Sequence, residues 1–296
     1  MVHKKIEGII AAVPTPLTAD AKAVDLENIK AQVERLAEAG IHGIVTTGTT
    51  GEFPALSLEE HKSVIKAYVD AVAGRFPVIA GLGFNSTQLA IEMAQYSEKG
   101  GADACMIVPP FYDPLPFKAL YKFFEDVCGS ISIPVMYYNL PGATGVHLTA
   151  EQFRELSKIK GFDYMKDTSG NAKELADLLT NPPDGLQPFN GWDTLTFFAM
   201  SHGARASVWG VASIVPKECV ELWNTFTKEK NLEKAREQWK FLWEVSDFLE
   251  SVCYPTGIKA GLEIIGHPAG PVRAPTLPLE QKDYDRLKKI LSKRKY

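Results

Sequence analysis

Cysteine is scarce in this chain of 296 residues, and its placement excludes two classes of site. The four cysteines, Cys105, Cys128, Cys219 and Cys253, lie far apart and form no C-x-x-C pair. Zinc sites typically show closely spaced cysteines, and disulfide frameworks are typical of short, cysteine-rich secreted chains. We therefore expect buried or unreactive thiols in a reducing compartment.

Long apolar runs and strong basic charge are also missing. No run approaches the roughly 18 apolar residues of a membrane span, and the N-terminal stretch has no apolar block of signal-peptide length. The formal net charge is −4, and the only basic cluster lies in residues 288–295. A nucleic-acid partner would need a basic face. We expect a soluble, intracellular, cytoplasmic protein that binds neither membrane nor nucleic acid.

Neither a dinucleotide motif nor a metal motif is present. The first predicted strand, residues 8–13, runs into Val-Pro-Thr-Pro-Leu and not into G-x-G-x-x-G, so dinucleotide binding loses support. The histidines His42, His61, His147 and His202 lack metal-ligand spacing. We expect no metal at the functional site.

What the chain does contain is a regular alternation of short apolar runs and helical patterns. Apolar residues recur with helical period at Ile29, Val33 and Leu36. Ser57 begins a capping-box pattern. The predicted strands are 8–13, 43–47, 77–81, 104–108, 135–139, 162–166, 186–190 and 206–209. The predicted helices between and after them are 26–39, 57–72, 86–99, 116–127, 149–159, 172–179, 194–201 and 216–227.

Eight strands, each followed by a helix, predict a (β/α)8 TIM barrel. The strands are hydrophobic on both sides, as a parallel sheet covered by helices requires. A doubly wound open sheet is the alternative fold. Three further helical segments, 231–250, 254–265 and 279–291, predict a C-terminal helical extension. We divide the chain into a barrel over residues 1–228 and an extension over residues 229–296.

Lys166 stands at the end of the sixth predicted strand, after an apolar and aromatic run. Most lysines are surface residues, which is the alternative here. Active sites of such barrels lie at the C-terminal ends of the strands. Burial there would lower the pKa of a lysine, and a neutral amine attacks ketones to form a Schiff base.

Polar residues also follow the second, fourth and fifth strands. The turn 46–52 is rich in threonine and glycine. It could offer N–H and hydroxyl groups to a carboxylate, or be a plain turn. Tyr112 follows the fourth predicted strand, and Tyr138 lies at the end of the fifth. A phenol at either place could transfer protons to a substrate, or it could have only a packing role.

The seventh and eighth strands add two more candidates. Asp193 suits a substrate hydroxyl, although an N-cap of the next helix is the favoured interpretation. Gly210 would leave room for a ligand. Lysine, tyrosine and an anion-binding turn together predict a metal-free class I lyase acting on 2-keto acids.

Three motifs in this order resemble the dihydrodipicolinate synthase/N-acetylneuraminate lyase family. They are Gly-Thr-Thr-Gly-Glu at 48–52, Tyr-Asn-x-Pro beginning at Tyr138, and Lys-Asp-Thr beginning at Lys166, 28 residues after Tyr138. The resemblance covers nearly the whole chain. It implies a (β/α)8 barrel with a helical C-terminal part, a homotetramer built as a dimer of dimers, and no cofactor beyond the covalent imine.

The resemblance also implies roles for individual residues. Lys166 would form the imine with pyruvate or another 2-keto acid, and Tyr138 would shuttle protons. Thr49 and Thr50, with Gly48, would hold the keto-acid carboxylate. In the synthase branch a tyrosine matching Tyr112 is lent by the neighbouring subunit.

In the lyase branch, residues matching Thr168, Gly191 and Asp193 contact the hydroxyls of the sugar-derived substrate. We include Val208, in the last strand, among the predicted substrate-binding residues.

One departure from the synthase pattern bears on the substrate. Lysine-pathway synthases usually carry an arginine where this chain has Ala143, so a bidentate carboxylate clamp is missing. We therefore expect an aldolase that acts on 2-keto-3-deoxy sugar acids. Within the family, we expect the chain to be nearer these aldolases than the lysine-pathway synthases. The alternatives are a sugar-acid dehydratase, a 4-hydroxy-tetrahydrodipicolinate synthase and a non-catalytic keto-acid-binding barrel.

Overall fold

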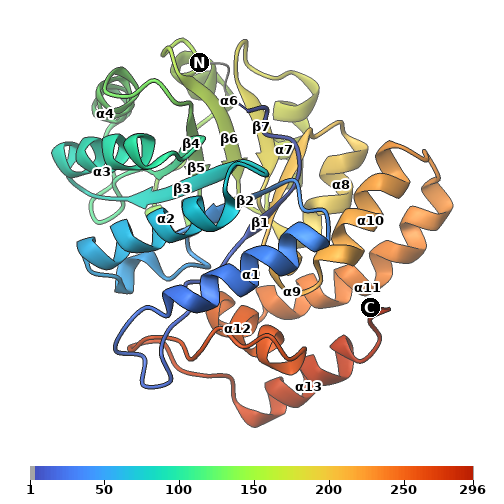
Figure 1. The fold of residues 1–296 in the computed structure, drawn as a ribbon. Helices are drawn as coiled ribbons and strands as arrows, with labels where there is room; N and C mark the ends of the chain where they lie inside the picture. Colours follow the sequence, from blue (N-terminus) through green and yellow to red (C-terminus); the bar gives the residue numbers. More distant parts are fainter. Residues whose placement is uncertain (1–3, 296) are drawn as a thin grey trace.

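Eight parallel strands form a closed barrel in the computed structural model, which describes residues 4–295. The strands pair in sequence order and the last pairs with the first, which confirms the predicted (β/α)8 fold (Figure 1). No predicted strand end is displaced by more than two residues. The strands are β1 (Gly8–Ala12), β2 (Gly43–Thr46), β3 (Val78–Gly83), β4 (Ala104–Val108), β5 (Val135–Asn139), β6 (Phe162–Asp167), β7 (Gln187–Asn190) and β8 (Ala206–Trp209).

Helices cover the outside of the barrel at or near the predicted positions. Ser57 forms the predicted capping box at the start of α2, and Thr149 forms another at the start of α6. Very short helices such as α5 and α9 escaped prediction, because a single turn shows no periodicity. The helices around the barrel are α1 (Leu26–Glu38), α2 (Leu58–Val72), α3 (Thr87–Gly100), α4 (Phe117–Gly129), α5 (Pro141–Thr144), α6 (Ala150–Leu156), α7 (Ala172–Thr180), α8 (Thr196–Ser201), α9 (Val211–Ile214) and α10 (Pro216–Thr227). Two 3-10 segments are η1 (Phe53–Ala55) and η2 (Asp193–Leu195).

Both faces of the barrel wall are buried, which explains why the strands do not alternate between apolar and polar residues. Inside the barrel, Ile10, Val45 and Met136 belong to one apolar cluster with Tyr138 and Phe189. Two larger clusters fill the layer between the strands and the helices. Polar side chains at the inner C-terminal ends of the strands are therefore exceptions to an apolar interior.

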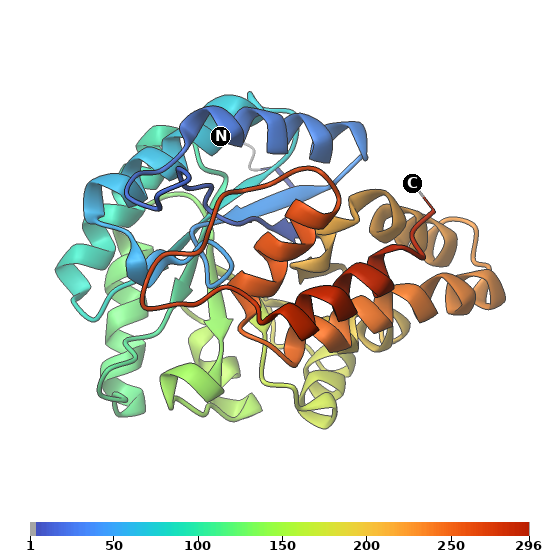
Figure 2. The same cartoon turned by 90° about the horizontal axis from the view of Figure 1, so that it is seen from below.

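The C-terminal extension consists of α11 (Leu232–Glu250), α12 (Tyr254–Ile264) and α13 (Gln281–Leu291). Figure 2 shows that the segment between α12 and α13 crosses one end of the barrel and reaches the start of α1. A buried ion pair joins Lys259 Nζ to Glu52 Oε1 at 2.6 Å. The Arg273 guanidinium binds both carboxylate oxygens of Glu60, each at 2.8 Å. These contacts fasten the extension to the loop after β2 and to the first turn of α2.

Three of the four cysteines are buried, in line with the expected buried or unreactive thiols. Cys105, Cys128 and Cys219 are buried, Cys253 is exposed, and all four thiols are free. Among the helices of residues 4–295, none is both long enough and apolar enough to cross a membrane.

Candidate active site

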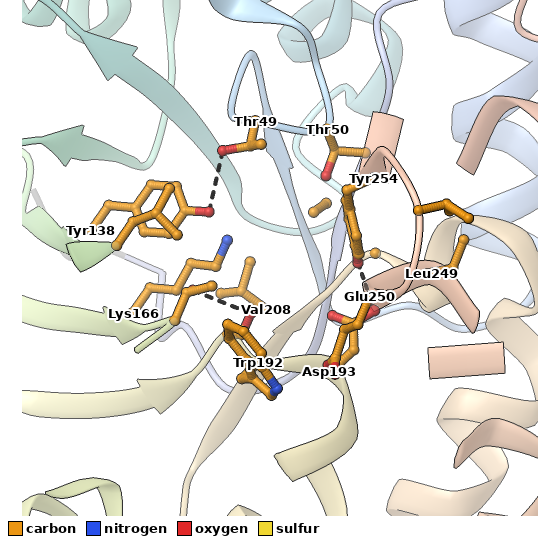
Figure 3. A pocket seen from close by; sticks show the side chains of 16 residues that line it. Thr49, Thr50, Tyr138, Lys166, Trp192, Asp193, Val208, Leu249, Glu250 and Tyr254 are labelled. Atoms are coloured by element: carbon orange, nitrogen blue, oxygen red, sulfur yellow. Dashed lines mark hydrogen bonds between the residues drawn. The ribbon is translucent and has the colours of Figure 1, made fainter. Parts of the chain in front are cut away.

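Lys166 lies inside the mouth of the barrel, one residue before the end of β6. Its register places it between Tyr138 on β5 and Phe189 on β7. The side chain is only 6% exposed, and Nζ lies 3.9 Å from the centroid of the Tyr138 ring (Figure 3). The alternative of an ordinary surface lysine is therefore wrong.

Tyr138 connects this amine to the turn after β2. Its hydroxyl lies 3.3 Å from Oγ1 of Thr49, within hydrogen-bonding distance (Figure 3). Burial acts to raise the pKa of the Tyr138 phenol, but the nearby Lys166 charge and the Thr49 hydrogen bond outweigh it. The net result is a pKa below the ordinary tyrosine value, which favours proton transfer at this hydroxyl.

The threonine-rich turn is held in a specific shape. Thr47 adopts a left-handed backbone conformation with φ of 49°, and its Oγ1 donates to the Gly81 carbonyl at 2.9 Å. Within residues 4–295, the backbone N–H groups of Thr49 and Thr50 donate no hydrogen bond to a protein acceptor. Two free N–H groups at the barrel mouth provide the donors that a carboxylate needs.

A cavity of about 200 Å³ opens above Lys166. It brings together most of the predicted site, namely Thr49, Thr50, Tyr138, Lys166, Thr168, Gly191, Asp193 and Val208. The other lining residues are Ala12, Leu140, Trp192, Gly210, Leu249, Glu250, Val252 and Tyr254.

Two predicted site residues do not line this cavity. A Cβ on Gly48 would lie 3.2 Å from Cε of Met106, so this glycine makes room for a side chain of the barrel interior. Tyr112 is 88% exposed on the loop after β4, where Asn85 Oδ1 accepts from its backbone N–H at 3.3 Å. The roles assigned to both residues stay predictions.

The positions of Lys166 and Thr168 require a glycine at residue 191. A Cβ at this position would lie 2.4 Å from Cε of Lys166 and 2.4 Å from Oγ1 of Thr168. The Gly191 carbonyl also accepts a hydrogen bond of 3.2 Å from Thr168 Oγ1. The missing side chain therefore gives Lys166 the space for its observed position.

Asp193 does not cap the next helix, contrary to the favoured interpretation. It is the first residue of η2, whose cap position is Trp192 and lacks a side-chain capping bond. Its Oδ2 instead accepts a hydrogen bond of 2.6 Å from the Tyr254 hydroxyl (Figure 3). Burial raises the pKa of Asp193 to about 7, although the Tyr254 hydrogen bond lowers it. Asp193 therefore contributes a buried carboxyl group to the wall of the cavity, and this group can gain or lose a proton near neutral pH.

Gly210 lines the cavity, and its missing side chain also makes room for a neighbouring residue. A Cβ there would lie 2.1 Å from the hydroxyl oxygen of Tyr254, so that side chain already fills the gap. Tyr254 comes from α12, and Glu250 at the end of α11 lines the same cavity. Glu250 Oε1 accepts from the backbone N–H of Thr194 at 2.8 Å.

Tyr254 and Glu250 are functional-site candidates that sequence reasoning missed. Helical periodicity placed both on helices of the extension but carried no information about which helix end faces the barrel mouth. A second contact that reasoning missed joins the motif residues Asn139 and Asp167, where Nδ2 donates to Oδ1 at 2.6 Å. Burial raises the pKa of Asp167, although the Asn139 hydrogen bond lowers it.

Comparison with known proteins agrees with this arrangement. The model of the dihydrodipicolinate synthetase family matches residues 5–294. A 4-hydroxy-tetrahydrodipicolinate synthase from Methanopyrus kandleri is 35% identical, over 98% of this chain and 96% of its own length. One from Archaeoglobus fulgidus is 35% identical over 96% of this chain and 97% of its own.

Solved structures show the same barrel. A dihydrodipicolinate synthase (dapA) aligns with a TM-score of 0.91 at 34% identity, over 97% of this chain and 98% of its own. YagE from E. coli K12, in complex with pyruvate, aligns with a TM-score of 0.92 at 26% identity and 98% coverage of both chains.

These relatives do not support the expected closeness to the sugar-acid aldolases. Both archaeal relatives carry the name 4-hydroxy-tetrahydrodipicolinate synthase. The family itself is established by a match over nearly the full length and by identities above 30%. The chain belongs to the dihydrodipicolinate synthetase family of enzymes.

Proposed function

We propose that this enzyme is a pyruvate-dependent lyase that holds its keto-acid substrate as an imine on Lys166. The observation that carries the proposal is the buried Lys166 amine, 3.9 Å from the Tyr138 ring centroid at the barrel mouth. Support also comes from YagE, whose solved structure contains pyruvate.

The reaction begins with imine formation. The free-base amine of Lys166 attacks the C2 ketone, the carbinolamine loses water, and a protonated imine remains. This cation accepts electrons from the bond between C3 and C4. Tyr138 takes the proton from the C4 hydroxyl as that bond breaks, which releases an aldehyde and leaves an enamine.

Protonation of the enamine at C3, followed by hydrolysis of the imine, frees pyruvate and regenerates the Lys166 amine. Condensation is the same sequence in reverse, with the enamine carbon attacking the aldehyde and Tyr138 returning the proton. The Thr49 hydroxyl stabilises the phenolate form of Tyr138 through its hydrogen bond. The free N–H groups of Thr49 and Thr50 bind the carboxylate of the keto acid.

The charge of the cavity indicates an aldehyde without an anionic group. Asp193 and Glu250 line it, and Lys166 is the only basic side chain of residues 4–295 that does so. A second carboxylate would meet the buried Asp193 and the half-buried Glu250, and no cation other than the Lys166 imine itself. A 2-keto-3-deoxy sugar acid satisfies this condition, because its only carboxylate lies beside the reacting ketone. Loss of a hydroxyl from the same imine, as in a dehydratase, is compatible with this charge as well.

A second candidate function is 4-hydroxy-tetrahydrodipicolinate synthase, which the names of the relatives favour. Its aldehyde, aspartate semialdehyde, carries a carboxylate. Ala143 supplies no guanidinium for that group. Sequence similarity and site charge therefore point to different aldehydes but to one Lys166 imine.

Other elements of the proposal rest on the family resemblance. The enzyme needs no metal or other cofactor, and it acts in the cytoplasm. It assembles as a homotetramer in which Tyr112 reaches a neighbouring site. The 88% exposure of Tyr112 supports a role outside its own chain.

Borohydride trapping tests the imine. The enzyme is incubated with pyruvate, reduced with sodium borohydride, digested and analysed by mass spectrometry. We expect the adduct mass on the Lys166 peptide and its absence in Lys166→Arg, which keeps the charge but loses the nucleophile. Lys259, a buried lysine paired with Glu52, is an internal control that stays unmodified. An adduct on another lysine, or none, contradicts the proposal.

Pyruvate consumption in condensation, or pyruvate release in cleavage, then separates the candidate substrates. Aspartate semialdehyde with pyruvate, a panel of neutral aldehydes with pyruvate, and 2-keto-3-deoxy sugar acids alone are compared by kcat/KM. A preference for aspartate semialdehyde would establish the second candidate.

A further inference from the structure

Glu52 closes the threonine-rich turn at its far end, and its backbone conformation is unusual. It is left-handed, with φ of 55°, as is Thr47 at the near end of the turn with φ of 49°. A residue with a Cβ rarely adopts this conformation and keeps it only where its surroundings enforce it. Between them lie Thr49 and Thr50, whose N–H groups we assign to the keto-acid carboxylate. The direction of those N–H groups therefore depends on what holds each end of the turn.

The near end of the turn is held by the barrel itself. Thr47 Oγ1 donates to the carbonyl of Gly81, on β3, at 2.9 Å. At the far end, the Glu52 N–H donates to the Thr49 carbonyl at 3.0 Å. This backbone bond lies within the turn, so the anchor of the far end must come from the Glu52 side chain.

The C-terminal extension holds the Glu52 carboxylate. Oε1 lies 2.6 Å from Nζ of Lys259 on α12, and both side chains are at most 5% exposed. Oε2 accepts from the Arg273 backbone N–H at 2.9 Å. Lys259 Nζ also donates to the Pro271 carbonyl at 2.7 Å. Each charge therefore has its partners inside the protein, on segments far apart along the chain.

A buried ion pair adds direction to a contact more than it adds stability. Removing two charges from water costs much of what their attraction returns, so a well-packed apolar pair would stabilise the fold as well. The Lys259 ammonium instead fixes the Glu52 carboxylate at one point. The same helix carries Tyr254, which lines the catalytic cavity. Helix α12 therefore reaches the active site at two places.

We propose that Glu52 and Lys259 are positioning residues for the carboxylate-binding turn. Their ion pair holds Glu52 in its left-handed conformation, and the turn then directs the Thr49 and Thr50 N–H groups toward the substrate. Binding of the keto-acid carboxylate depends in this way on the C-terminal extension, although neither charged side chain lines the catalytic cavity. The inference rests on the proposed function, because it requires a keto-acid carboxylate at these N–H groups.

Imine trapping with two ketones tests the positioning role. Pyruvate carries the carboxylate, and hydroxyacetone presents a ketone of similar size without it. The rate constant for Lys166 adduct formation is measured with each ketone in the presence of sodium cyanoborohydride, for the wild-type enzyme and for Lys259→Met. We expect the variant to lose about 10–100-fold with pyruvate, as when a charge-assisted hydrogen bond is weakened, and to change less than about twofold with hydroxyacetone. An equal loss with both ketones, or no loss with pyruvate, overturns the inference.

A double variant separates positioning from stability. Lys259→Met leaves the Glu52 charge buried without its cation, which destabilises the fold. Glu52→Gln combined with Lys259→Met removes both charges and should recover most of the lost stability in urea unfolding. We expect the double variant to keep the pyruvate-specific loss, because no ionic contact then orients residue 52. Wild-type trapping rates with pyruvate in the double variant would show that the pair acts through stability alone and would overturn the inference.

Lys293→Met is the matched control. Lys293 forms an ion pair with Glu244 inside the C-terminal extension, so this variant removes a lysine charge and leaves the turn intact. We expect both trapping rates to equal those of the wild-type enzyme.

The same measurements distinguish failure of this inference from failure of the proposed function. Absence of the Lys166–pyruvate adduct in the wild-type enzyme removes the proposed function. An adduct whose preference for pyruvate over hydroxyacetone is the same in all variants removes only the positioning role.

Discussion

The Tyr254 hydroxyl donates a hydrogen bond of 2.6 Å to Asp193 Oδ2 and joins the C-terminal extension to η2, the 3-10 segment that follows β7. The phenol occupies the space that Gly210 leaves open. The extension therefore forms part of the wall of the catalytic cavity as well as a cover for the barrel. The Asp193 carboxyl meets both the substrate space and this second layer of structure.

Tyr254→Phe removes that hydrogen bond and keeps the ring. We expect a loss of about 1–3 kcal/mol in the free energy of unfolding, because Asp193 stays buried with one donor fewer. The pKa of Asp193 should rise further above its raised value. Urea unfolding and carboxyl titration by NMR measure the two effects. Tyr284→Phe is the control, since that hydroxyl makes only a 3.5 Å contact with Glu263.

Asp193 should make stability depend on pH. Its pKa is raised from 3.8 to about 7 in the folded protein, so between these values the folded state binds more protons than the unfolded state. The free energy of unfolding then falls as pH rises through this window, by up to about 1.4 kcal/mol per pH unit. Asp193→Asn should flatten this dependence between pH 5 and 7 in urea unfolding. An unchanged slope would show that the carboxyl is not protonated there.

Tyr138→Phe separates imine formation from carbon–carbon chemistry. The ring beside Lys166 remains, so the pyruvate adduct should still be trapped. Turnover should fall by about 10²–10⁴-fold because the proton shuttle is lost. Thr49→Val should have a milder effect and shift the kinetic pKa upward, since the Thr49 hydrogen bond lowers the pKa of Tyr138. Full turnover by Tyr138→Phe would reassign the proton transfer.

Gly191→Ala should impair the active lysine more than the fold. The added Cβ would collide with Cε of Lys166 at 2.4 Å and displace the amine. We expect at least about a hundredfold loss of kcat/KM, as ångström-scale misplacement of a reacting group produces. Trapping with pyruvate and urea unfolding are measured together. Gly129→Ala, where a Cβ meets no atom within 4 Å, serves as the control for a neutral glycine replacement.

Much of the fold follows from local patterns in the chain. The strands β4, β5 and β8 match their predictions at both ends, because short apolar runs between helical periods carry the barrel signal. Lys166 and Tyr138 could be identified from strand ends, since closing a parallel barrel brings those ends to one rim. The threonine turn reaches the same rim for the same reason.

The contacts between the C-terminal extension and the catalytic cavity could not be predicted from local sequence patterns. Tyr254 and Asp193 are 61 residues apart, and nothing in either local sequence specifies the partner. The N-cap assignment of Asp193 was reasonable by residue type, but a tertiary donor competes for the same carboxylate.

We could predict the closed barrel, and the position of the Lys166 amine, the Tyr138 phenol and the threonine turn at its rim, from the chain alone, because each depends on spacing along one strand or turn. The groups that surround that amine, and the hydrogen bond that holds the Asp193 carboxyl, became visible only in the folded molecule. Those properties depend on how distant segments pack against one another, and packing is set by side-chain shape across the whole chain.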